Sequence, residues 1–149
     1  MLTKVNIWSK INTKPTNSVK LFLHEQAQLL GEVTNGVIKA VVETTLKEEN
    51  KRHFRHDLFV YVPSLDFVEL LLTVDHLTAT DEYPVAIIEQ LGHHVVATAS
   101  FLNGNVEFKE HKNTGVQANN YDEFVDEITK LLESPNVVAY LNTLFSRSV

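Results

Sequence analysis

The chain has 149 residues, of which 44% are hydrophobic, so it is long enough to bury one core, and we expect a single α+β domain over 1–149. Its 13 basic and 19 acidic residues give a net charge of -6, and the basic residues are scattered, which argues against a nucleic-acid partner. There is no cysteine, hence no disulfide, thiolate metal site or thiol nucleophile, and no apolar run approaches the ~20 residues of a membrane span. We therefore expect a cytoplasmic protein with no membrane partner.

The first two elements are predicted to be a short strand over 4–8 and a helix that starts after Pro15. Asn17 or Ser18 can cap the free amides of this helix, and Gly31 or Gly36 can end it, because glycine readily takes the left-handed conformation. The helical stripe consists of Val19, Phe22, Leu23, Leu30 and Val33.

From residue 37 the apolar period changes to two, which predicts a half-buried strand over 37–46. Two further strands, 54–62 and 68–76, flank a turn, and we expect a register in which paired residue numbers sum to 130. This register sets Arg55 opposite Asp75 and keeps apolar residues opposite each other: Leu58 with Leu72 and Val60 with Leu70.

The next apolar run, 84–91, has no clear period, which suggests a strand covered on both faces. A hairpin is then predicted at Asn103-Gly104, since both central positions of a type I′ turn need positive φ. Its expected pairs are Phe101 with Val106 and Ala99 with Phe108. The segment 111–120 is expected to be a loop.

Two consecutive helical segments are expected to end the chain. Asn120 with Glu123 three residues later is close to a capping box, and Ser134-Pro135 restarts the helix, because proline is tolerated only in a first turn. The fold class predicted is thus α+β: an antiparallel meander of about six strands, with a seventh if the N-terminal strand joins it, preceded by one helix and covered by two C-terminal helical segments.

This order of elements resembles the helix-grip arrangement of the START and Bet v 1-like families, in which a curved meander wraps a long C-terminal helix around a ligand cavity. The resemblance rests on element order alone, and the break at Ser134-Pro135 departs from the continuous last helix of those families. It implies an alternative helix-grip-like fold with a cavity.

Three residues are candidates for ligand binding: His56, His76 and Glu89. The preferred register places the two histidines on one face, diagonal to each other and roughly 7 Å apart, too far for mutual contact but able to flank a ligand. The alternative interpretation, which we favour, is a structural role, in which two partly buried imidazoles have hydrogen-bond partners such as Thr44. Glu89 is the only acid inside an apolar strand.

No metal site, cofactor site or catalytic residue is predicted. The neighbouring histidine pairs point to opposite faces of a strand, and neither a nucleophile elbow nor a phosphate-binding glycine motif occurs.

The leading hypothesis is a non-catalytic binding protein, of an inhibitor, immunity or regulatory type, that acts on a protein partner. It rests on the acidic chain and on apolar residues at nominally polar strand positions: Val41, Phe59, Tyr61 and Leu71.

One alternative is a protein that binds a small apolar ligand in a cavity of at least about 300 Å³, with Phe54, Phe101, Phe108 and Phe124 as walls. A second alternative is a hydrolase that uses histidines and carboxylates, and a homodimer through a free sheet edge is also expected.

Overall fold

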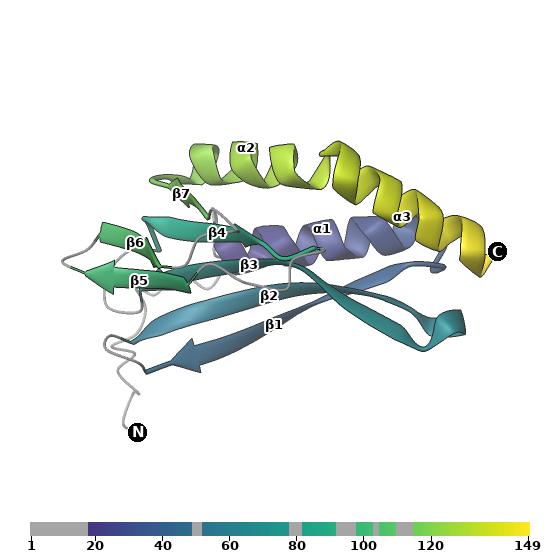
Figure 1. Ribbon diagram of the computed structural model, residues 1–149, viewed down its shortest axis with the longest axis horizontal. Coiled ribbons are helices and arrows are strands. Elements are labelled where there is room, and N and C mark those ends of the chain that lie inside the picture. Colours follow the sequence, from purple (N-terminus) through teal and green to yellow (C-terminus); the bar gives the residue numbers. More distant parts are fainter. Residues whose placement is uncertain (1–17, 49–51, 78–81, 92–97, 103–104, 110–114) are drawn as a thin grey trace, which may run out of the picture.

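The computed structural model describes these parts of the chain: 18–48, 52–77, 82–91, 98–102, 105–109 and 115–149. In Figure 1 the described elements form two layers, an antiparallel sheet and a layer of helices on one of its faces, which confirms the predicted α+β arrangement. None of the helices in the described ranges is long and apolar enough to cross a membrane.

Helix α1 (Val19–Val33) begins where the sequence predicts. Ser18 is its N-cap, and the Ser18 hydroxyl accepts a hydrogen bond from the Leu21 N–H at 3.3 Å. After the helix the chain turns through Gly36, whose φ of 80° is unfavourable for any residue with a Cβ. The turn leads into strand β1 (Lys39–Lys47), which packs beneath α1.

The next two strands, β2 (His53–Val62) and β3 (Phe67–Leu77), form a long antiparallel pair around the short 3-10 turn Pro63–Leu65. The predicted register is confirmed over the half of the pair that lies away from this turn, where Arg55 lies opposite Asp75. In this half the alternation of apolar and polar residues is regular, and one register satisfies both faces.

A β-bulge shifts the register in the half of the pair nearest the turn. Phe59 lies opposite Leu70 and Val60 opposite Glu69, so the predicted pairing of Val60 with Leu70 is wrong. The extra residue is Leu71, which is 1% exposed and points to the helix layer, not to the opposite face as predicted. The bulge therefore adds a leucine to the core, and it leaves this residue without a partner on β2.

Within the part of the chain that the structure describes, the main sheet has five strands, not about six. Strand β4 (Val85–Glu89) pairs with β3, and the short strand β7 (Val116–Ala118) pairs with β4, which gives the order β1-β2-β3-β4-β7. Strands β5 (Thr98–Leu102) and β6 (Asn105–Lys109) pair with each other and, among the described residues, form a separate two-stranded sheet. The place beside β4 is thus taken by a segment expected to be a loop.

The backbone pairing of the β5–β6 hairpin is as predicted. Phe101 lies opposite Val106 and Ala99 opposite Phe108. The turn residues 103–104 and the expected strand over 4–8 lie outside the described residues.

Two C-terminal helices, α2 (Tyr121–Leu132) and α3 (Pro135–Ser148), complete the helix layer. The Asn120 side chain accepts a hydrogen bond from the Glu123 N–H at 2.9 Å, so the predicted cap is confirmed. The predicted restart at Ser134-Pro135 is also confirmed, and the Ser134 hydroxyl accepts a hydrogen bond from the Val137 N–H at 3.4 Å. The last part of the chain is thus two helices joined at Ser134, whereas a helix-grip arrangement has one long helix.

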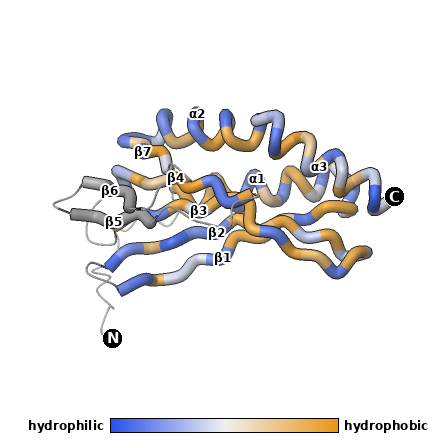
Figure 2. The backbone as a smooth tube through the Cα atoms, in the orientation of Figure 1, coloured by the Kyte–Doolittle hydropathy of each residue, from blue (hydrophilic) through white to orange (hydrophobic). Residues whose placement is uncertain are grey.

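The core lies between the sheet and the helices, and Figure 2 shows the apolar sides of α2 and α3 turned toward the sheet. Strand β4 is buried on both faces, as its lack of a period predicts. The largest fully buried side chains include Phe124, Leu23, Ile38, Leu71, Leu72, Ile88 and Ile128.

Candidate functional site

His56 and His76 meet on the helix-covered face of the sheet, where they are 3% and 6% exposed. Their Nε2 atoms lie 2.7 Å apart and their ring centroids 4.9 Å apart, so the prediction that they cannot touch is wrong. The reason is that the diagonal spacing of roughly 7 Å separates backbone positions, and long side chains can bridge it. Phe54 lies opposite His76 and packs on both rings, with centroid distances of 6.3 Å to His56 and 5.6 Å to His76.

Each ring nitrogen of the pair has a hydrogen-bond partner. His76 Nδ1 lies 3.1 Å from the Leu77 carbonyl oxygen, which can only accept, so a neutral His76 donates there and accepts at Nε2 from His56. His56 Nδ1 then accepts from the Thr44 hydroxyl at 2.9 Å. Because all four ring nitrogens are hydrogen-bonded, the pair has the contacts expected of a structural role. Thr44 is the partner that the sequence suggests.

Glu82 joins this cluster from the irregular segment just before β4. Its carboxylate accepts from the Val19 N–H at 3.1 Å and 3.3 Å, and one of its oxygens lies 3.8 Å from His76 Nε2. The first amides of a helix lack partners within the helix, so Glu82 satisfies one at the start of α1. No pattern in the sequence points to this contact across 63 positions.

Burial lowers the pKa of His56 to about 4, and the charge of His76 acts in the same direction, followed by Lys20 and His24 on α1. Removal from water disfavours the charged imidazolium, and nearby positive charge disfavours it further. His56 is therefore neutral at pH 7.

Glu89 lies apart from the two histidines. On the β3–β4 ladder it lies opposite Leu72, whereas His76 lies opposite Val85, four positions and roughly 13 Å away at about 3.3 Å per residue. Glu89 instead lines a hollow of about 240 Å³ with Lys130 and other residues of α2. The three predicted ligand-binding residues are thus not brought together.

A cavity of about 210 Å³ lies between the sheet and the helices, smaller than the roughly 300 Å³ of a typical ligand pocket. A hollow of about 310 Å³ lies between α1 and α2, and neither space is lined by the histidine pair. The side chains of Phe101 and Phe108, two of the expected walls, lie outside the described residues. The inner cavity is lined by Ala27, Leu30, Leu58, Val60, Leu71, Leu132 and Leu141, among others.

The face of the sheet without helices carries an apolar area near the β2–β3 turn, on β1, β2 and β3. Here Val41 lies opposite Phe59, which lies opposite Leu70, and in the next row Tyr61 lies opposite Val68. Val41 is 41% exposed and Val68 is 64% exposed. We call these five residues the apolar sheet patch.

Polar residues adjoin the apolar sheet patch on the same face. Glu43 lies opposite Asp57, and two acids in directly opposite positions repel each other. A hydrogen bond from the Thr73 hydroxyl to the Asp57 carboxylate, at 2.6 Å, offsets part of this repulsion.

Among the described residues, no group of three or more histidines or acids is arranged to hold a metal ion.

Replacing Glu82 with alanine is expected to lower the free energy of unfolding by about 1–2 kcal/mol, because α1 loses a charged acceptor at its first amide. Glu82→Gln should cost less, since an amide oxygen can still accept. The matched control is Glu25→Ala in the exposed middle of α1, with an expected change within about 0.5 kcal/mol. Urea unfolding followed by circular dichroism measures the three values, and equal effects of Glu82→Ala and Glu25→Ala would contradict this role.

Comparisons with protein-family models, with curated proteins and with solved structures gave no match to this chain.

Proposed function

We propose that this chain is a non-catalytic interaction protein, of an inhibitor, immunity or regulatory type, that binds another protein through the apolar sheet patch. The observation that carries the proposal is the patch itself, in which aliphatic and aromatic side chains of three strands lie in adjacent rows on the face without helices. Exposed apolar side chains grouped on one face are characteristic of interaction surfaces.

Charge specifies the kind of partner. Glu43 and Asp57 lie beside the patch, and the chain as a whole carries a net charge of -6. A partner surface that combines aliphatic side chains with lysine or arginine would fill the patch and neutralise the two acids. We propose a cytoplasmic setting for this interaction, in keeping with the absence of cysteine from the sequence.

A non-catalytic role also agrees with the geometry of the histidine pair. A general base must reach the proton that it removes from a substrate, within about 3 Å. The nitrogens of His56 and His76 are instead committed to each other, to Thr44 and to a backbone carbonyl. Their contacts support a part in holding β1, β2 and β3 together.

The test is a pull-down that compares the wild-type chain with Val68→Glu, followed by affinity measurements on each purified candidate. A charge at this exposed patch position is expected to lower the affinity for a true partner by about tenfold or more. The matched control is Val33→Glu at the end of α1, where valine is 79% exposed but lies on the helix layer. Equal binding by both variants would exclude the patch as the binding surface.

A further inference from the structure

Strand β1 forms one edge of the main sheet and, among the described residues, pairs with β2 alone. Six of its nine residues are exposed, and it contains no proline, glycine or bulge. Of the devices that keep an edge strand from pairing, it has charged side chains, and their order along the strand favours pairing with a second copy of the same strand. We propose that two copies of the chain pair antiparallel along β1, with the two-fold axis at Val41, and so form one continuous sheet. This inference does not depend on the proposed function.

The charges on β1 are self-complementary in this register. Lys39, Val41 and Glu43 alternate on the face without helices, so an antiparallel copy centred on Val41 sets each Lys39 opposite Glu43 of the second copy. Because of the two-fold symmetry, the dimer contains two such ion pairs. A register centred on Glu43 would instead place the two Glu43 carboxylates against each other.

The same register resolves the repulsion between Glu43 and Asp57. These acids lie opposite each other on β1 and β2, and Glu43 has no neighbouring strand on its outer side among the described residues. Lys39 of the second copy would occupy that side. The ion pairs thus form where the monomer has an excess of negative charge.

Apolar rows also become continuous across the axis. Within one copy Val41, Phe59 and Leu70 lie side by side, and pairing about Val41 joins this row to the identical row of the second copy. The two patches then form one surface on a shared face, so dimerisation enlarges the patch without covering its face. Cross-strand contact of the two Val41 side chains contributes to the interface.

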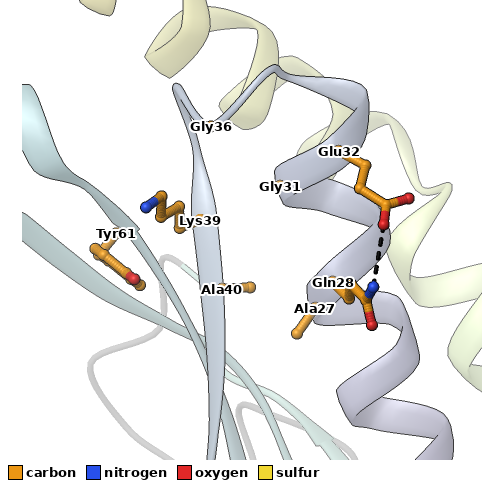
Figure 3. Close-up of a pocket in the computed structure, with 8 residues that line it drawn as sticks. All are labelled: Ala27, Gln28, Gly31, Glu32, Gly36, Lys39, Ala40 and Tyr61. Atoms are coloured by element: carbon orange, nitrogen blue, oxygen red, sulfur yellow. Dashed lines mark hydrogen bonds between the residues drawn. The ribbon is translucent and has the colours of Figure 1, made fainter.

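A hollow at the start of β1 can receive the second copy. It has a volume of about 320 Å³ and lies between the last turns of α1 and β1, where Gly31 and Gly36 leave space (Figure 3). A Cβ at Gly31 would meet no atom within 4 Å. In the proposed register, Leu46 of the second copy, which is 38% exposed in the monomer, comes to the neighbourhood of Gly36.

Disulfide trapping tests the register, because the chain has no cysteine of its own. Two residues directly opposite on antiparallel strands have Cα atoms about 4.5–5.5 Å apart, within the range of a disulfide. Val41→Cys is therefore expected to oxidise to a dimer at least about tenfold faster than Val68→Cys, an exposed control away from the axis. Thr45→Cys tests the other charge-matched register, which pairs Glu43 with Lys47; faster trapping there would overturn our assignment.

Charge reversal tests the interface without an introduced thiol. By analytical ultracentrifugation the wild-type chain should have twice the monomer mass, Glu43→Lys should weaken association about tenfold or more, and Lys39→Glu/Glu43→Lys should restore it. A wild-type chain that stays monomeric at about 100 μM would overturn the proposal, as would a double variant no tighter than Glu43→Lys.

Discussion

Replacing Arg55 with alanine is expected to lower the free energy of unfolding by about 3–5 kcal/mol. Both carboxylate oxygens of Asp75 accept from the Arg55 guanidinium, at 2.9 Å and 3.0 Å, and Asp75 is 0% exposed. Removal of the guanidinium would leave a buried negative charge without its ion-pair partner, which is more costly than loss of the attraction alone. Urea unfolding at pH 7 followed by circular dichroism measures the change.

An exposed arginine provides the matched control. Arg52 lies 3.5 Å from Glu48, with both side chains about two-thirds exposed, and Arg52→Ala should cost less than about 1 kcal/mol. The double variant Arg55→Met/Asp75→Leu should be more stable than Arg55→Ala, because no unpaired charge remains. A cost below about 1 kcal/mol for Arg55→Ala would show that water or other groups compensate Asp75.

Acidification from pH 7 to about 4 is expected to remove roughly 3 kcal/mol of stability through His56 alone. In the unfolded chain its pKa is near 6.5, whereas in the fold burial and the neighbouring His76 lower the pKa to about 4. Between these values the unfolded state binds more protons, so the contribution of His56 is fully present above pH 6.5 and is lost as the pH falls toward 4.

The measurement compares urea unfolding at several pH values for the wild type and for His56→Gln, which cannot titrate at this position. The variant should lose less stability than the wild type between pH 6.5 and 4, because groups distant from His56 contribute equally to both curves. Asn142→Gln, at an exposed position on α3 without a titratable group, should retain the wild-type dependence. Parallel curves for wild type and His56→Gln would contradict the lowered pKa.

The predicted site illustrates what strand alternation can and cannot specify. Alternation places His56 and His76 on one face and Arg55 opposite Asp75, because side chains along a strand point to alternate faces. It does not specify how far two rings lean, so it misses the 2.7 Å contact between the imidazoles. No local pattern predicts the contact of Glu82 with the Val19 N–H, since the two residues are 63 positions apart.

Helix caps, the β5–β6 pairing and the two-sided burial of β4 were all determined by the sequence, because each depends on hydrogen bonds or periods within a few residues. Tertiary structure alone decided the bulge at Leu71, the pairing of β7 with β4 and the histidine contact. These features depend on which distant surfaces must be filled and which backbone groups remain unpaired once the helices cover the sheet.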